Sequence, residues 1–130
     1  MNSTLHIAMR CSDLKEASCF YRSFPNTKIT RIYSDRICLN FMKIQLVMHL
    51  EKLKEEEKKN NQPYPFHFGI NFHEKDDFDI VLKFLKQGKY DFLKNHRFKG
   101  SESEHYSLII FDPFGNCIEF KHYLKNPEGY

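Results

Sequence analysis

The fold is decided by a stretch that occurs twice in the chain. It reads HIAMRCSDLKEASCFYRSF at residues 6–24 and HFGINFHEKDDFDIVLKFL at residues 67–85. Each copy opens with a short apolar segment typical of a β-strand and continues with apolar residues at helical spacing. In the first copy, Asp13 and Glu16 form the pattern of a helix start, and Gly88 follows the second copy as a helix end. Such a repeat constrains the whole architecture.

Three segments rich in β-branched and aromatic residues follow each predicted helix. They are KITRIYS, RICLNF and KIQLVMHL in the first half, and DFLKNHRF, YSLIIFD and CIEFKHY in the second. The sequence therefore predicts an α+β fold of two βαβββ modules that form a curved, cup-like mixed sheet with the helices outside. The predicted parts are module one at 4–50, a polar linker at 51–64, module two at 65–124 and a C-terminal tail at 125–130.

Three polar side chains lie among bulky apolar neighbours in the predicted strands. His6 and His67 occupy the second position of the two opening strands, and Glu119 lies in the last strand. Because side chains alternate across a strand, all three would point away from the helices and into the cup. Two imidazoles and a carboxylate that meet there form a facial site with open positions for a divalent metal ion. A single strand histidine is more often structural, but these occur at repeated positions.

Further candidates follow from the repeat and from strand alternation. IQLVMHL lies over IEFKHYL, so Gln45 corresponds to Glu119 and is expected as a fourth ligand or as a partner of a ligand. His49 is an even step from Gln45 and is a candidate acid or base. Arg10 and Tyr106 are candidates for substrate contact. FDPFGN, residues 111–116, predicts a tight turn that delivers Glu119 to its place, with a structural role for its aspartate.

Composition and charge exclude several classes of function. The net charge is +3, but residues 51–61 alternate acids and bases, and we expect no nucleic-acid partner. No apolar stretch approaches the roughly 20 residues of a membrane-spanning helix, and the first residues do not resemble a secretory signal. The four cysteines lack CxxC spacing. We therefore expect a cytoplasmic protein with inert thiols and no membrane partner.

The chain resembles the vicinal oxygen chelate superfamily, which includes glyoxalase I, extradiol dioxygenases, fosfomycin resistance enzymes and bleomycin-binding proteins. The resemblance rests on residues 6–24, on HFGINF and on FDPFGNCIEF. It implies paired βαβββ modules around a divalent metal that is chelated by adjacent oxygens of a small-molecule substrate, and a homodimer. The ligand positions fall on His6, Gln45, His67 and Glu119. Fe²⁺ or Mn²⁺ is expected ahead of Ni²⁺ or Zn²⁺.

The resemblance leaves two kinds of reaction open, dioxygenation and lyase or isomerase chemistry. Extradiol dioxygenases have a tyrosine where this chain has Ile109, and fosfomycin resistance enzymes have a threonine where it has Ala8. Glyoxalase I usually has two metal-bound glutamates, but an amide at Gln45 cannot act as a base, so Glu119 would carry the proton alone. The alternative is a metal-free binding protein of the bleomycin-resistance type, for which 13 Phe and 7 Tyr would supply aromatic walls.

Overall fold

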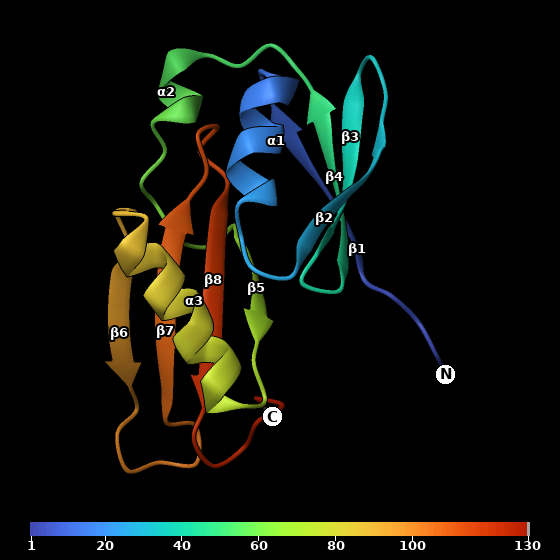
Figure 1. Cartoon of the computed structure of the whole chain (residues 1–130). Coiled ribbons are helices and arrows are strands. Elements are labelled where there is room, and N and C mark those ends of the chain that lie inside the picture. The colour runs from blue at the N-terminus through green and yellow to red at the C-terminus, as the bar shows by residue number, and fades with distance from the viewer. Residues whose placement is uncertain (130) are drawn as a thin grey trace. The chain divides into compact units, whose positions relative to one another are not determined.

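The structure is a computed structural model that describes residues 1–129, and it divides into two compact units (Figure 1). Unit 1 consists of Met1–Asn60 together with Asp112–Asn116. Unit 2 consists of Asn61–Phe111 and the chain from Cys117 onward. The last residue of the predicted tail, Tyr130, lies outside the described residues. Each unit is described below by itself.

Unit 1 contains a four-stranded mixed sheet. Its elements are β1 (His6–Cys11), α1 (Leu14–Arg22), β2 (Thr27–Ile32), β3 (Arg36–Phe41), β4 (Ile44–Leu50) and the short α2 (Glu55–Lys58). The strand order is β1-β4-β3-β2, with β1 parallel to β4 and the other pairs antiparallel. A βαβββ module is therefore present in the first half, as predicted.

Unit 2 repeats this topology. Its elements are β5 (Phe68–Asn71), α3 (Lys75–Gln87), β6 (Leu93–Arg97), β7 (His105–Phe111) and β8 (Cys117–Tyr123). The strand order is β5-β8-β7-β6, and again the first strand is parallel to the last. The predicted α+β fold with two βαβββ modules is confirmed.

The first helix packs on one face of its own sheet. Its start is capped as predicted, because the backbone N–H of Glu16 donates to Asp13 Oδ1 over 2.9 Å. Ala17 and Tyr21 are the buried residues of α1, and the Tyr21 ring meets the ring of Phe41 edge-on, with 5.6 Å between centroids. The opposite face of this sheet carries His6 and the even-numbered positions of β1.

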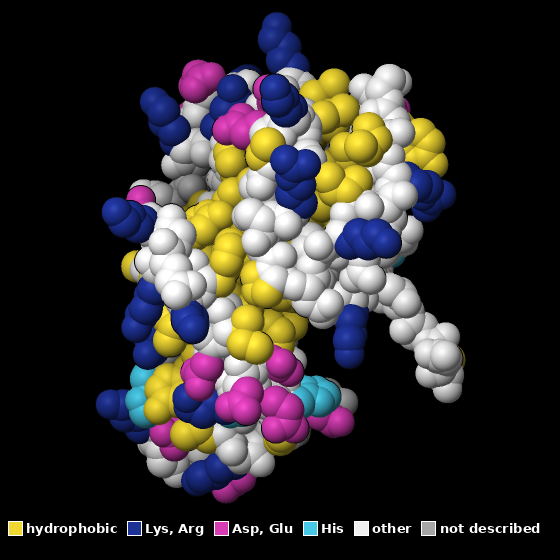
Figure 2. All heavy atoms as spheres, viewed as in Figure 1, with side chains coloured by type: hydrophobic (Ala, Val, Ile, Leu, Met, Phe, Trp, Pro, Cys, Tyr) yellow, Lys and Arg dark blue, Asp and Glu magenta, His cyan; other side chains and the backbone are white. Residues whose placement is uncertain are grey.

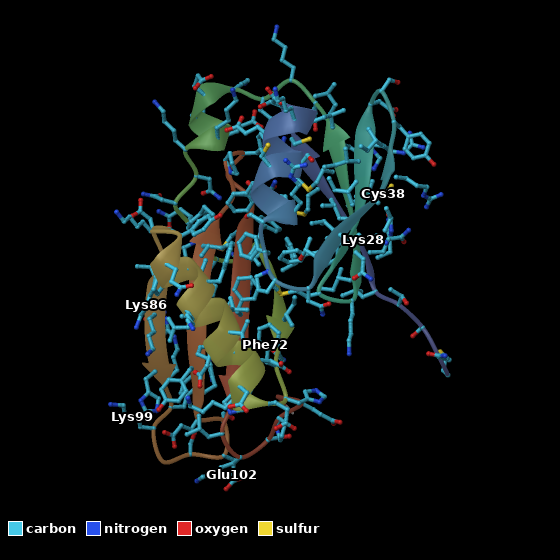
Figure 3. All side chains as sticks on the ribbon, in the orientation of Figure 1. Lys28, Cys38, Phe72, Lys86, Lys99 and Glu102 are labelled. Atoms are coloured by element: carbon cyan, nitrogen blue, oxygen red, sulfur yellow. The ribbon has the colours of Figure 1, made fainter. Side chains whose placement is uncertain are left out.

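The helix of unit 2 covers its sheet in the same way. Phe78, Val81 and Leu85 are the buried residues of α3. Phe72, labelled in Figure 3, stacks on Phe120 of β8 with 6.2 Å between ring centroids. Figure 2 shows acidic side chains gathered over the end of α3 at which the helix begins. Negative charge at this end stabilises the helix, because it interacts favourably with the helix dipole. Within residues 1–129, no helix is long and apolar enough to cross a membrane.

The turn between β7 and β8 is formed as predicted, and its residues count with unit 1. Gly115 has a φ of 83°, and the backbone N–H of Asp112 donates to the carbonyl of Asn116 over 2.9 Å. The Asn116 side chain donates to the carbonyl of Arg10 over 2.8 Å, and the Asn60 side chain donates to the carbonyl of Gly115 over 3.0 Å. These bonds fix the turn to the first module.

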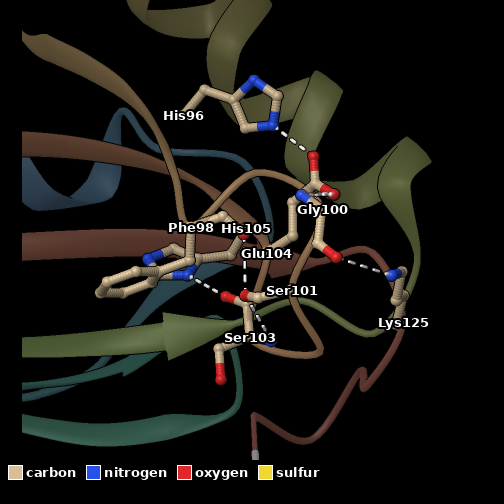
Figure 4. Close-up of polar contacts among 8 residues, drawn as sticks. All are labelled: His96, Phe98, Gly100, Ser101, Ser103, Glu104, His105 and Lys125. Carbon is tan, nitrogen blue, oxygen red and sulfur yellow. Dashed lines mark hydrogen bonds and ion pairs between the residues drawn. The ribbon is translucent and has the colours of Figure 1, made fainter.

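The loop between β6 and β7 is held by one carboxylate (Figure 4). Glu104 accepts a hydrogen bond from the backbone N–H of Gly100 at Oε1, over 3.0 Å, and lies 2.6 Å from His96 Nε2 at Oε2. Ser101 donates to the carbonyl of Phe98, which closes the turn within the loop. The amide proton of Gly100 and the His96 ring both favour the ionised form of Glu104 and lower its pKa.

Candidate metal site

The first pair of predicted site residues lies on the face of the unit 1 sheet that α1 leaves uncovered. His6 and Gln45 are direct partners in the parallel pairing of β1 with β4. His6 Nδ1 lies 2.9 Å from Gln45 Oε1. A recess of about 480 Å³ borders Gln45 and is lined by Thr4, Thr30, Leu39, Asn40, Lys43, Ile44 and Gln45. Its volume falls in the range of small-molecule sites.

The second pair lies on the corresponding face of the unit 2 sheet. His67 Nε2 is 3.1 Å from Glu119 Oε2, and the Glu119 side chain is only 4% exposed. The Tyr64 ring packs edge-on against the His67 ring, with 5.4 Å between centroids. The strand partner of Glu119 is Gly69, so His67 lies two residues earlier and reaches Glu119 diagonally. Both modules therefore have a contact between the histidine and the polar residue of the last strand. The strand pairing that produces this contact differs by two residues between the modules.

The close approach of β5 to β8 depends on a glycine. A Cβ atom added at Gly69 would meet the carbonyl oxygen and the side chain of Glu119. Only glycine leaves room for the Glu119 backbone at this point, which holds the carboxylate beside His67.

Both pairs have the spacing that two ligands of one ion require. Two donor atoms at about 2.1 Å from an ion, and at right angles around it, lie roughly 3 Å apart. The nitrogen-to-oxygen distances of 2.9 Å in the His6–Gln45 pair and 3.1 Å in the His67–Glu119 pair match this value. Imidazole with carboxylate or amide oxygen is also a donor set that divalent iron, manganese, nickel and zinc accept. Each pair therefore supplies two donor atoms of a kind that such an ion accepts, at a separation that a hydrogen bond or ion pair also has.

The two pairs belong to different units. Each pair supplies only two of the donor atoms that a metal site needs. Among residues 1–129, no group of three or more His, Cys, Asp or Glu side chains is placed so that it could hold a metal ion. The structure thus brings His6 to Gln45 and His67 to Glu119.

A lysine that sequence reasoning gave no role completes the surroundings of Glu119. Lys121 Nζ lies 3.7 Å from Glu119 Oε2, the same oxygen that faces His67. Strand alternation could have found this residue, since it is two positions from Glu119 on the same face. A carboxylate this buried needs positive partners, and Lys121 is one of them.

Next to Lys121 lies a hydroxyl group without a partner. Ser107 of β7 is the cross-strand partner of Lys121 and is fully buried. Its Oγ is the one buried side-chain nitrogen or oxygen atom in the described chain that lacks a hydrogen-bond partner. Buried polar groups are nearly always hydrogen-bonded, so this position calls for an explanation.

Two other candidates share the face of unit 1 but not the immediate surroundings of Gln45. Arg10 and His49 are strand partners at the far end of β1 and β4. His49 is exposed and lies four residues beyond Gln45, which is roughly 13 Å along a strand. Arg10 Nη1 forms an ion pair with Glu57 over 2.8 Å. Neither side chain is brought to His6 by the structure.

Tyr106 lies on the other face of its sheet. Its strand partner is His122, and its ring packs near Phe78 of α3, with 6.3 Å between centroids. Ile109, not Tyr106, shares a face with Glu119, because Ile109 is the strand partner of Glu119. Strand alternation therefore directs Tyr106 toward the helix, and the structure does not bring it to the His67–Glu119 pair.

A separate buried cluster in unit 1 is structural rather than reactive. Asp112 accepts a hydrogen bond from the Tyr21 hydroxyl over 2.5 Å and from the backbone N–H groups of Phe114 and Asn116. Burial raises the pKa of Asp112 and of Tyr21. Burial also raises the pKa of the nearby Cys11 thiol to about 11, so this thiol stays protonated and is not a nucleophile.

Comparison with known proteins places these observations in a family. Residues 3–120 match the model of the Glyoxalase/Bleomycin resistance protein/Dioxygenase superfamily. No curated protein sequence matches the chain. Among solved structures, a glyoxalase/bleomycin resistance protein/dioxygenase from Alicyclobacillus acidocaldarius is 37% identical, with a TM-score of 0.88 and coverage of 99% of this chain and 97% of that one.

Two more distant structures share the fold. The fosfomycin resistance protein FosX from Listeria monocytogenes is 12% identical, with a TM-score of 0.68 and coverage of 95% of both chains. A lactoylglutathione lyase from Agrobacterium tumefaciens is 18% identical, with a TM-score of 0.66 and coverage of 94% of both chains.

Proposed function

Because the chain belongs to the Glyoxalase/Bleomycin resistance protein/Dioxygenase superfamily, we propose that it is a metal-dependent enzyme acting on a small molecule. His6, His67 and Glu119 would hold a divalent metal ion, Fe²⁺ or Mn²⁺ ahead of Ni²⁺ or Zn²⁺. Gln45 would be a fourth ligand or would orient His6 by its hydrogen bond. The bound ion would supply Lewis acidity to two adjacent oxygens of the substrate and stabilise the negative charge that develops there.

The single observation that carries this proposal is the burial of Glu119 beside His67. The carboxylate is 4% exposed, lies on the sheet face that α3 leaves uncovered, and has its Oε2 atom 3.1 Å from an imidazole nitrogen. An ionised carboxylate in such a place costs several kcal/mol of desolvation unless a cation compensates it. A metal ion held by these two donors would be that cation.

The residues divide the remaining work according to their chemistry. Glu119 is the only carboxylate among the four proposed ligands, so it is the group able to accept and return a proton of the substrate. Gln45 cannot do this, because an amide has no basic oxygen. His49 is the further candidate for proton transfer, and Arg10 for substrate contact, because both lie on the same face of the unit 1 sheet as Gln45.

We also propose a homodimer in the cytoplasm. A three-ligand site requires one module with the His6–Gln45 pair and one with the His67–Glu119 pair, and a second chain supplies both kinds of module by symmetry. The four cysteines are unpaired, which agrees with a reducing compartment.

One observation favours the alternative of a metal-free binding protein. Glu119 already has positive neighbours, because Lys121 and His67 both approach its Oε2 atom. A protein of the bleomycin-resistance type could keep this arrangement and bind a ligand against aromatic side chains. The two functions are separated by the experiment that follows.

The test is metal analysis of the purified protein, followed by calorimetric titration with Mn²⁺ and Ni²⁺. We expect about one ion per site, and loss of binding in His67→Ala and Glu119→Gln. His96→Ala and Glu104→Gln are matched controls, because they remove the other His–Glu contact of unit 2, at 2.6 Å, without touching the site. Wild-type protein that binds no divalent metal but retains small-molecule binding would favour the alternative.

The type of reaction is decided by two assays on the metal-loaded protein. Oxygen consumption with catechols would identify a dioxygenase, because ring cleavage incorporates dioxygen. Isomerisation of a hemithioacetal without oxygen uptake would identify glyoxalase-type chemistry, for which the lactoylglutathione lyase is a structural neighbour. Glu119→Gln should abolish either activity.

A further inference from the structure

Lys121 and His67 approach the same atom of Glu119. The distance to Glu119 Oε2 is 3.7 Å from Lys121 Nζ and 3.1 Å from His67 Nε2. The other oxygen of this carboxylate has no ion-pair partner among the described residues. One buried oxygen therefore faces two nitrogen groups, one from an imidazole and one from a lysine side chain.

A metal ion bound by His67 and Glu119 would compete with this lysine. The ion and the ammonium group would each need the same carboxylate oxygen, and two cations within about 4 Å of one another repel strongly where solvent is partly excluded. The Lys121 side chain is 26% exposed, so its flexible stem has a path to solvent. The ammonium group can therefore leave without disturbing the sheet.

The surroundings of Lys121 indicate what it would do next. Once separated from Glu119, the ammonium group has no other carboxylate partner among the described residues. Its cross-strand neighbour Ser107 carries the hydroxyl that has no hydrogen-bond partner. Ser107 and Lys121 are cross-strand partners, so their side chains lie next to one another on the same face of the sheet. The Lys121 ammonium group and the Ser107 hydroxyl, side by side, could together bind an anionic oxygen group.

From these contacts we propose that Lys121 is a resident counter-ion of Glu119 that a bound metal ion displaces, and that the freed ammonium group then binds an anionic group of the substrate. The substrate is thus an acid, with a carboxylate, phosphate or phosphonate close to the oxygens that the metal binds. This inference rests on the proposed function, since it requires a metal at Glu119. Lys121 is a positioning residue toward the metal and a specificity residue toward the substrate.

The first test is the affinity of the full-length protein for Mn²⁺, measured by calorimetry. Lys121→Met keeps the aliphatic stem and removes the competing charge, so it should bind Mn²⁺ roughly tenfold more tightly than wild type. Lys121→Arg keeps the charge and should bind like wild type. Lys75→Met is the matched control, because it removes one lysine and its 2.7 Å ion pair with Asp79 on α3. It should leave Mn²⁺ affinity unchanged.

The second test uses sulfate as a probe anion on the Mn²⁺-loaded protein. Sulfate should bind several-fold more weakly to Lys121→Met than to wild type, and Lys121→Arg should restore its affinity. In wild type, Mn²⁺ should strengthen sulfate binding, because it frees the lysine. Equal sulfate affinity in wild type and Lys121→Met would overturn the substrate part of the inference.

The outcomes also separate this inference from the proposed function. Mn²⁺ binding that is lost in His67→Ala but equal or weaker in Lys121→Met would overturn the counter-ion role and leave the metal site intact. Failure of wild type to bind any divalent metal would overturn both proposals together.

Discussion

Tyr21 donates its hydroxyl proton to Asp112 over 2.5 Å, and neither residue is more than 4% exposed. Asp112 also accepts the backbone protons of Phe114 and Asn116, so one carboxylate ties α1 to the turn that precedes β8. Because β8 carries Glu119, this contact within unit 1 is expected to be important for stability rather than for chemistry.

Tyr21→Phe should lower the free energy of unfolding by about 1–2 kcal/mol, because it removes one hydrogen bond to a buried charged group. Asp112→Ala should cost more, about 3 kcal/mol, since it leaves the Tyr21 hydroxyl and two backbone N–H groups without their acceptor. Urea unfolding measures both values. Tyr33→Phe is the control, because that tyrosine is exposed. A Tyr21→Phe variant as stable as the Tyr33→Phe variant would contradict this account.

At the scale of secondary-structure elements, the parallel pairing of β5 with β8 depends on the close approach that Gly69 allows. Gly69→Ala would place a methyl group against the carbonyl of Glu119, so β5 must shift. We expect a loss of about 1–3 kcal/mol in unfolding free energy and weaker metal binding, because His67 lies two residues away. Gly100→Ala is the comparison, because its added Cβ meets nothing and only its φ of 79° is unfavourable.

The loop between β6 and β7 should be sensitive to acid. The pKa of Glu104 is lowered in the folded protein by the Gly100 amide and by His96, so the unfolded chain binds the proton more readily. The contribution of Glu104 is therefore present above its unfolded pKa of about 4.3 and is lost as pH falls through its lower folded value. Amide hydrogen exchange checks this prediction. The Gly100 amide should exchange several-fold faster in Glu104→Gln at neutral pH, with no change at Gly115.

Individual elements show how much of the fold could be predicted. β8 was predicted with the bounds that the structure has, Cys117–Tyr123, because its alternating apolar residues lie between a clear turn and a polar tail. The helix α2 at Glu55–Lys58 falls in the predicted linker, since a single turn of charged residues leaves no apolar period. His67 lies just before β5 rather than inside it, because β5 pairs with β8 only from Phe68 onward.

The candidate site could be predicted only in part, for a related reason. Strand alternation was enough to place Glu119 and Lys121 on one face, but pairing register is not visible in a sequence. Register determines that His6 faces Gln45 directly, whereas His67 reaches Glu119 from two residues away. It also separates Tyr106 from Glu119. The face on which a side chain lies thus follows from one strand, whereas its neighbours depend on how two strands pair.

At the scale of the whole molecule, the repeat has produced two modules that are alike in topology and unlike in chemistry. One contributes an imidazole with a neutral amide, and the other an imidazole with a carboxylate. Because the Gln45 amide carries no charge, the only negative charge among the proposed ligands is that of Glu119. A divalent ion there would keep a net positive charge, which suits the binding of anionic or acidic substrate oxygens.

If two chains of the proposed homodimer share the site, damaged chains should complement one another. His6→Ala chains mixed with Glu119→Gln chains form some mixed dimers, in which one site combines the intact His6 of one chain with the intact Glu119 of the other. With random pairing, roughly a quarter of all sites should regain Mn²⁺ binding after the chains are unfolded and refolded together. Calorimetry measures the recovered stoichiometry.

A second mixture is the control for Mn²⁺ binding that is regained without a shared site. His67→Ala chains mixed with Glu119→Gln chains carry both defects in unit 2, so no pairing of modules can restore the His67–Glu119 contact. This mixture should bind no Mn²⁺ beyond the level of either variant alone. If the first mixture also stays at that level, while native mass spectrometry shows that mixed dimers have formed, the two chains do not share the site and each must build it from its own modules.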